Sequence, residues 1–391
     1  MAVNNMTIEQ AYTLINAIHS QVTGVTALTA VDTATFTSVA QSTLKSGYAP
    51  VLNAITQVLS KTLIAVRPYS RKFKGLEVTT ERWGGIIRKI NFIDTGTEED
   101  PTFQLVDDQS IDQYAVKKPA VAETRYVGSN VYEGRYTIFT KQLDTAFSSP
   151  SEFAAFMSGL MTHFSNEREQ WLEDNSRSIV MNMIAAKAAA DTSNVLHLLT
   201  EYNTDTGLSL TATTVRQPAN FPAFAKWLYA RVQSISELMT ERSQYGEMLV
   251  GGQPVFRHTP MSDQRVYINA DFLAHMNAEV IADTYHDNFL RFADVEPVNF
   301  WQSIKAPLSV KATPVYINGN TGAVVTAESA VTVSNVLGVM FDRDAMGYNI
   351  YDDSLETSPY NARGQYYNLF SHVRVQNQND LTEKCIVLCL D

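Results

Sequence analysis

One segment decides the fold: residues 149–190, which read SPSEFAAFMSGLMTHFSNEREQWLEDNSRSIVMNMIAAKAAA. Ser149 can cap a helix, Pro150 suits the first helical position, and Glu152 completes a capping box. Apolar side chains then recur every three or four residues, at Phe153, Phe156, Met157, Leu160, Phe164, Trp171, Leu172, Ile179, Met183 and Ala186. No proline interrupts them, so the pattern predicts one helix over about 150–190. Its length would be roughly 60 Å, several times the usual helix length.

So long a helix occurs in two settings. A coiled coil needs apolar heptads flanked by charged e and g positions, and this segment sustains no such heptads. A helix that forms the rigid backbone of an elongated subunit therefore fits the sequence better.

The chain after this helix predicts a mixed body of helices and strands. Asn318-Gly319 is a hairpin-turn signal between two short strands. From Val336 onward the chain is nearly all strand. Apolar periodicity in between predicts a helix over about 222–242, a strand over 265–269 and a helix over 271–285.

The two cysteines, Cys385 and Cys389, lie in the segment CIVLC of the last predicted strand. Strand geometry puts them on one face about 13 Å apart, beyond the roughly 7 Å between Cα atoms that a disulfide can bridge. We expect buried free thiols in a reducing compartment.

The first 70 residues are predicted to be helical, because apolar stripes follow the capping residue Thr7 and the helix-starting Pro50. This arm has too little apolar area to fold alone. It needs a partner, which is either the body or a neighbouring chain.

From Phe73 to Phe139 the sequence changes to strands, with β-rich stretches at 86–94 and 123–139. The polar span between them offers few core residues. We expect the loop from about Leu76 to Phe139 to lie over a neighbouring subunit and to contribute little to the core of its own.

Charges in this region are separated into blocks. An acidic block is followed by two lysines: Glu98, Glu99, Asp100, Asp107 and Asp108, then Lys117 and Lys118. The span is either a solvated hairpin or a projecting loop that meets complementary charges on another subunit. A basic cluster ends the arm, consisting of Arg67, Arg71, Lys72 and Lys74. It is interpreted either as a DNA contact or, with more weight, as a solvated linker or a salt-bridge partner for a neighbour's acidic loop. All eleven are candidate subunit-interface residues.

Composition and motifs exclude several classes of protein. The 391 residues include 30 Lys and Arg against 41 Asp and Glu, a net charge of −11 that has the wrong sign for neutralising phosphates over a broad face. No run of about 18 apolar residues and no signal-peptide pattern occur, so no membrane span is expected. Walker loops, zinc-protease motifs and nucleophile elbows are missing, and no catalytic, cofactor or metal residue is assigned.

The last strands carry a further pattern. In GVMFDRDAMGYNIYDD and HVRVQNQNDLTEKCIVLCLD, a Gly-x-x-x-Asp strand precedes an Arg-bearing strand and a final apolar strand. Together with the order of elements, this resembles the major capsid proteins of tailed bacteriophages with the Hong Kong 97-like fold. The matching positions are Gly338, Asp342, Arg374 and Ile386 to Leu390. The compact size and long polar arm are most similar to the shell proteins of short-tailed phages.

This resemblance implies an α+β fold in five parts. They are a helical N-arm over 1–72, an extended β E-loop over 73–140, a P-domain over 141–220 with a spine helix at about 150–190, a mixed α/β A-domain over 221–345, and C-terminal strands over 346–391 that return to the body.

It also implies a structural function rather than an enzyme. Subunits would assemble as hexamers and pentamers of an icosahedral shell around double-stranded DNA, in a virion built in the host bacterial cytoplasm. Scaffolding, portal and head-decoration proteins are implied partners, DNA contacts would be weak and non-specific, and neither a cofactor nor a membrane is expected. Family members often carry a scaffolding segment that a protease removes; with Met1 present, we expect neither cleavage nor such a fusion. Two alternatives stay open, an encapsulin-like nanocompartment shell and a soluble carboxylate-dependent hydrolase.

Overall fold

The computed structural model describes most of the chain, namely residues 6–24, 29–62, 71–73, 75–78, 86–93, 107–108, 110, 114, 116, 118, 120–128, 130–190, 192–253, 255–282 and 295–391. Its α-helices are α1 (Ile8–Thr23), α2 (Thr33–Lys45), α3 (Tyr48–Thr62), α4 (Thr140–Ala146), α5 (Pro150–Ala190), α6 (Leu198–Thr206), α7 (Phe221–Thr240) and α8 (Ala270–Ala282). Its strands are β1 (Ile86–Phe92), β2 (Val121–Val127), β3 (Asn130–Phe139), β4 (Val195–His197), β5 (Gln264–Asn269), β6 (Val295–Val298), β7 (Val310–Ala312), β8 (Val315–Ile317), β9 (Val324–Thr326), β10 (Val331–Val333), β11 (Val336–Asp342), β12 (Met346–Thr357), β13 (Tyr366–Asn379) and β14 (Cys385–Cys389).

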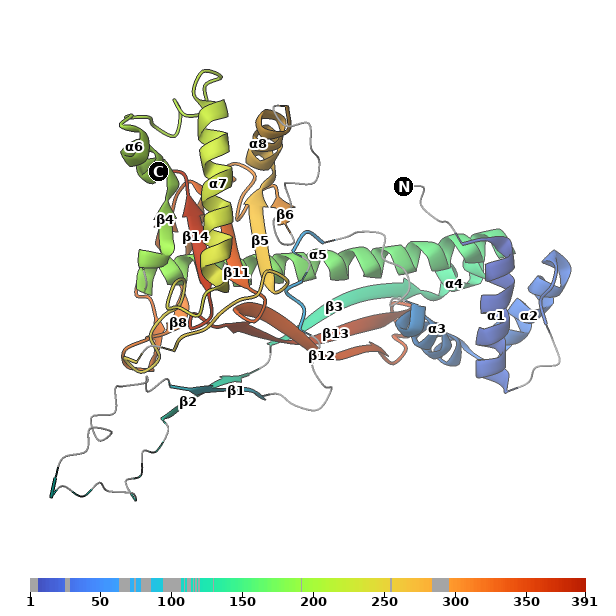
Figure 1. The fold of residues 1–391 in the computed structure, drawn as a ribbon. Helices are drawn as coiled ribbons and strands as arrows, with labels where there is room; N and C mark the ends of the chain where they lie inside the picture. The colour runs from blue at the N-terminus through green and yellow to red at the C-terminus, as the bar shows by residue number, and fades with distance from the viewer. Residues whose placement is uncertain are drawn as a thin grey trace.

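The predicted long helix is confirmed. Helix α5 spans 41 residues without a break and runs through the length of the body (Figure 1). Its start is capped as the sequence indicates, because the Ser149 hydroxyl accepts a hydrogen bond from the backbone N–H of Glu152 at 3.3 Å. The apolar stripe is buried along the helix and links the cores at its two ends.

A three-stranded antiparallel sheet, in the order β12-β13-β3, lies along α5 (Figure 1). The ring of Tyr136 lies 5.7 Å from that of Phe164, and the ring of Tyr132 lies 4.5 Å from that of Trp171. Ile138 is fully buried in the same core. The expectation that residues up to Phe139 contribute little to the core is therefore wrong for β3, because this strand is hydrogen-bonded into the body.

A five-stranded sheet, β4-β14-β11-β5-β6, forms the second body of strands. Its alternating side chains face two cores. Cys385, Val387 and Cys389 pack in the core that contains the end of α5, while Ile386 and Leu388 pack with α7 and α8. Both cysteines are buried thiols, as predicted.

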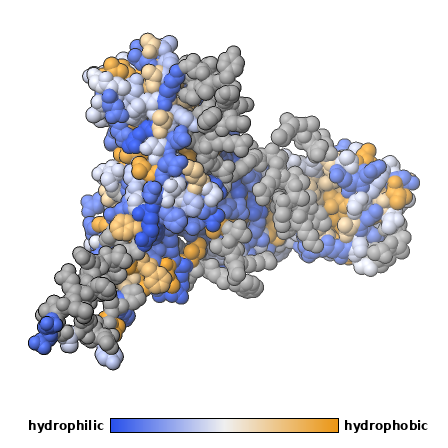
Figure 2. Space-filling model, viewed as in Figure 1, coloured by the Kyte–Doolittle hydropathy of each residue, from blue (hydrophilic) through white to orange (hydrophobic). Residues whose placement is uncertain are grey.

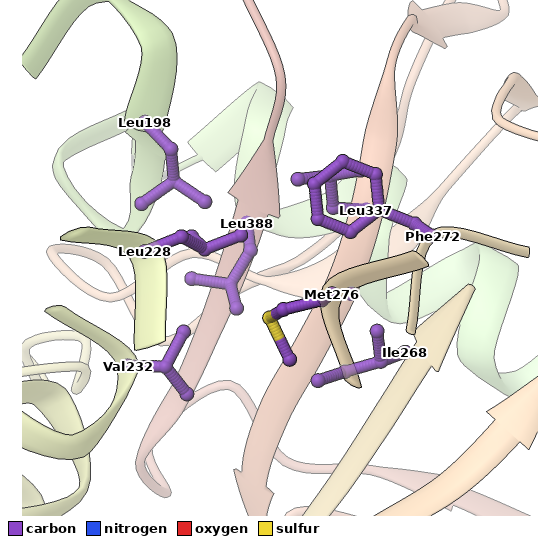
Figure 3. Close-up of a pocket in the computed structure, with 9 residues that line it drawn as sticks. Leu198, Leu228, Val232, Ile268, Phe272, Met276, Leu337 and Leu388 are labelled. Atoms are coloured by element: carbon purple, nitrogen blue, oxygen red, sulfur yellow. The ribbon is translucent and has the colours of Figure 1, made fainter. Parts of the chain in front are cut away.

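The close packing of β11 against β5 explains why a glycine stands at position 338, the first residue of the Gly-x-x-x-Asp pattern. A Cβ on Gly338 would lie 2.7 Å from the carbonyl oxygen of Tyr267, so β11 approaches β5 too closely for any side chain. Figure 3 shows the adjoining cavity, about 10 Å³, whose labelled side chains come from both the sheet and the helices α6, α7 and α8. Such a volume holds about one water molecule at most, so it is a packing defect and not a ligand site.

Asp342, the second residue of that pattern, closes the turn after β11. Its carboxylate accepts hydrogen bonds from the Thr259 hydroxyl at 2.7 Å and from the backbone N–H of Asp344 at 2.8 Å. Arg374 lies on the exposed side of β13, with its Nε 3.4 Å from a carboxylate oxygen of Asp352.

The N-terminal helices pack on the beginning of α5 (Figure 1). The rings of Phe36 and Phe153 lie 5.8 Å apart, and the Tyr48 hydroxyl donates to Asp144 at 2.8 Å. Of the two partners expected for this arm, the body of the same chain is the one observed.

Two details differ from the sequence predictions. Residues 195–220, expected with the long helix, pack instead with the helices after Phe221, since Leu198, Tyr202 and Val215 belong to their core. The hairpin β8–β9 exists, but its turn is longer than an Asn-Gly pair and takes its positive φ at Gly322.

Candidate subunit interface

A two-stranded antiparallel hairpin, β1–β2, projects from the body (Figure 1). Its register pairs Phe92 with Val121 and Ile90 with Glu123. Since side chains alternate across a strand, the hairpin has an outer face and an inner face. Exposure follows this alternation in β2, where every second residue is exposed.

The outer face carries large apolar side chains in contact with solvent. Exposed fractions are 68% for Phe92, 53% for Ile90, 50% for Val121 and 70% for Val127. Figure 2 shows apolar surface, in orange, where the hairpin leaves the body. A single exposed apolar residue is ordinary, but several on one strand pair indicate a surface that another molecule covers.

An ion-paired cluster lies between these apolar residues. The Arg125 Nε is 2.8 Å from Glu123, and the Arg88 Nε is 2.6 Å from the same carboxylate. Hydrogen bonds from Arg125 and then Arg88 lower the pKa of Glu123 to about 2. The outer face therefore combines apolar area with fixed charges, which is the composition of a specific protein interface.

The inner face contacts the body. Lys89 donates to Asp380 at 2.6 Å and also to Glu383, both in the loop between β13 and β14. The Gln376 side chain donates to the carbonyl of Tyr126 at 2.5 Å. The hairpin is thus anchored to the body by its inner face, while the described side chains of its outer face are exposed.

Only some of the charged candidates fall within the described residues. Asp107, Asp108 and Lys118 are exposed, as an interface role requires, and Asp108 has a positive φ of 65°. Lys72 is half-buried. Six candidates lie outside the described residues: Glu98, Glu99, Asp100, Lys117, Arg67 and Lys74.

Arg71 lies inside its own subunit rather than at the surface, with 8% of its area exposed. It pairs with Glu77 and, at 3.5 Å, with Glu169 on α5, and it lies over the ring of Tyr348. Its carboxylate partners belong to the same chain. The structure therefore places Arg71 in ion pairs within its own subunit.

Sequence reasoning missed the outer face of the hairpin, including Arg88, Phe92, Val121, Glu123 and Arg125. The available signal was the alternation of charged and apolar residues within 86–92 and 121–127. This alternation predicts two strands, but it does not indicate which face of the strand pair is exposed to solvent.

Within the described residues, no three His, Cys, Asp or Glu side chains lie close enough together to hold a metal ion. Nor does any helix within the described ranges have the length and apolar content needed to cross a membrane.

Comparisons with known proteins converge on one class. A family model described as Phi29-like phage major capsid protein matches residues 13–389. The chain is similar to one in the capsid structure of Staphylococcus phage Andhra, with a TM-score of 0.56, 13% identity, and coverage of 84% of this chain and 86% of that one. It is also similar to one in the structure of the head fiber and inner core protein of native bacteriophage P68, with a TM-score of 0.54, 10% identity, and coverage of 82% and 85%. No curated protein sequence matches. The expected α+β Hong Kong 97-like fold is confirmed by these likenesses.

Proposed function

The chain belongs to the Phi29-like phage major capsid protein family, and from this premise we propose that its subunits join through the outer face of the β1–β2 hairpin. The protein is a structural subunit of a bacteriophage head. We infer that hexamers and pentamers of it close an icosahedral shell around double-stranded DNA. The nanocompartment and hydrolase alternatives are not favoured by the family match.

The observation that carries the interface proposal is the uncovered apolar outer face. Phe92 is 68% exposed although an aromatic side chain can bury 150 Å² or more at an interface. Large aromatic side chains surrounded by fixed charges are typical anchors of protein interfaces. A second copy of this chain supplies such a cover in a shell, where every subunit presents the same hairpin.

We expect the double exchange Phe92→Ser and Val121→Ser to abolish assembly while leaving the subunit folded. Both side chains lie on the outer face, so their loss removes interface area and no described core contact. Light scattering would follow assembly, and circular dichroism would follow folding.

The matched control is Ile304→Ser, because Ile304 is 77% exposed on a turn between β6 and β7 and does not belong to the hairpin. It should assemble as the parent does. If the double variant assembles at the parent's rate, the outer face is not the interface.

The remaining partners follow from the shell function. We propose that the mature location is the virion, after assembly in the host bacterial cytoplasm. Scaffolding, portal and head-decoration proteins are proposed partners, and their contact residues are left unassigned. We propose no enzymatic activity and no cofactor for this structural subunit.

We also propose that the shell encloses DNA without binding it tightly. A net charge of −11 per chain, repeated over a shell, opposes the charge of the packaged polyanion. Arg71, once a candidate for DNA contact, is occupied by carboxylates of its own chain. Empty shells should bind duplex DNA near 150 mM salt no tighter than roughly 10⁻⁴ to 10⁻⁶ M in a filter or fluorescence assay. A nanomolar affinity of the shell for DNA, with a steep salt dependence, would contradict the proposal that the shell binds its DNA only weakly.

A further inference from the structure

A cluster of charged side chains lies where the inner face of the hairpin meets the body. Lys89 comes from β1, Arg257 from the segment between α7 and β5, and Asp380 and Glu383 from the loop between β13 and β14. The exposed fractions of these side chains are 25% for Lys89, 13% for Arg257, 3% for Asp380 and 11% for Glu383. Three parts of the chain that are distant in sequence are therefore joined by ion pairs with little access to water.

Within this cluster, Lys89 is the cation that the hairpin supplies. It contacts both carboxylates, at 2.6 Å from Asp380 and also within bonding distance of Glu383, while Arg257 pairs with Glu383. Burial alone would raise the pKa of Asp380, but Lys89, Thr382 and Arg257 together lower it below its ordinary value. Asp380 is thus a buried anion that depends on Lys89 for its stabilisation.

Other titratable groups surround these pairs. Tyr126 on β2 has its pKa raised by burial and by Asp380. Glu247 lies beside Arg257, and its carboxylate accepts from the backbone N–H of Arg257 at 3.1 Å. Lys384 donates a hydrogen bond to the carbonyl of Glu241 at 2.7 Å and interacts electrostatically with Glu247 and Asp342. None of these groups comes from β1, so none replaces the charge of Lys89 on that strand.

We propose that Lys89 is a positioning residue that fixes the angle at which the hairpin leaves the body, and so orients its outer face toward a second copy of the chain. This inference rests on the proposed function. Without the ammonium group, two buried carboxylates would face the hairpin with Arg257 as the remaining ion-pair partner among the described residues. Repulsion and hydration of these carboxylates would then move the strand pair away from the loop between β13 and β14.

The experiment measures the hairpin angle separately from assembly. Spin labels on Val121→Cys in the hairpin and Ile304→Cys in the body report their distance in full-length subunits that Phe92→Ser keeps unassembled. The native cysteines are buried and should not react. The parent should give one narrow distance distribution, Lys89→Met a broadened or longer one, and Lys89→Arg the parent's distribution. Lys141→Met, which removes an exposed lysine at the start of α4, is the matched control and should leave the distance distribution unchanged.

A second arm measures assembly in chains without labels and with Phe92 intact. Lys89→Met should assemble at least tenfold more slowly than the parent, and Lys89→Arg should restore the rate. If Lys89→Met does not fold, the double exchange Lys89→Met and Glu383→Gln takes its place. It removes one anion together with the cation, so the net charge of the cluster is kept, but the ion pair between β1 and the loop after β13 is still missing. An unchanged distance distribution in the folded variant overturns the inference, and so does a changed distribution with normal assembly. If no variant assembles, parent included, the shell proposal fails while the distance arm still decides the role of Lys89.

Discussion

Replacing Phe164 by proline is expected to prevent the protein from folding. Phe164 lies in the middle of α5, is 5% exposed and packs against Tyr136. Proline removes a helical hydrogen bond and clashes with the preceding turn, which costs about 3 kcal/mol or more. Loss of the buried ring costs about 3 to 5 kcal/mol in addition. Their sum is comparable to the whole stability of a typical domain, about 5 to 15 kcal/mol.

Two variants separate these contributions. Phe164→Ala removes the ring and keeps the helix, whereas Asn166→Pro breaks the helix at an exposed position two residues later. Denaturant unfolding should show a loss of about 3 to 5 kcal/mol for the first and about 3 kcal/mol for the second. Soluble Phe164→Pro protein that assembles normally would contradict the role of α5 as the rigid backbone of the subunit.

The Glu247→Gln variant is expected to be more stable than the parent at pH 8 and about equally stable at pH 4.5. Glu247 is 5% exposed, and burial raises the pKa of its carboxyl from 4.5 to about 7, against the opposing charges of Lys384 and Arg257. Between pH 4.5 and about pH 7, the Glu247 carboxyl loses its proton in the unfolded chain but keeps it in the folded protein. Stability therefore falls as pH rises, by up to about 3 kcal/mol, and Gln abolishes this contribution.

Denaturant unfolding of both proteins at pH 4.5, 6 and 8 checks this result. The quantity to compare is the difference in unfolding free energy between the two proteins at each pH. Burial also raises the pKa of Asp342, and this group contributes the same pH dependence of stability to both proteins. Glu237→Gln on the exposed side of α7 is the control and should change stability by less than about 0.5 kcal/mol at each pH. A Glu247→Gln protein that is less stable than the parent at pH 8 would show that the carboxylate is held charged by its cationic neighbours.

The long helix could be predicted because its signals are local. Ser149, Pro150 and Glu152 mark its start, and the spacing of apolar residues follows a 3.6-residue period whatever the rest of the fold does. The thiol state of the two cysteines could be predicted for the same reason, since strand geometry alone separates them too far for a disulfide.

The interface could not be predicted in this way, because exposure depends on tertiary packing. Arg71 stands in a basic run that looks like a surface cluster, yet it is buried against Glu169, which is 98 residues away in sequence. Phe92 has the apolar side chain of a core residue, yet it is 68% exposed, because no residue in the described part of its own subunit covers that face of the hairpin. Ion pairs between Lys89 and residues nearly 300 positions later carry no sequence signal at all.

If this chain builds a shell, the mass of the purified protein shows it most directly. Multi-angle light scattering under assembly conditions should give particles in the megadalton range, or rings the size of capsomers that convert to such particles. The double exchange at Phe92 and Val121 should remain a subunit-sized species under the same conditions. A small oligomer of fixed size for the parent chain, unchanged by concentration or time, would contradict the account.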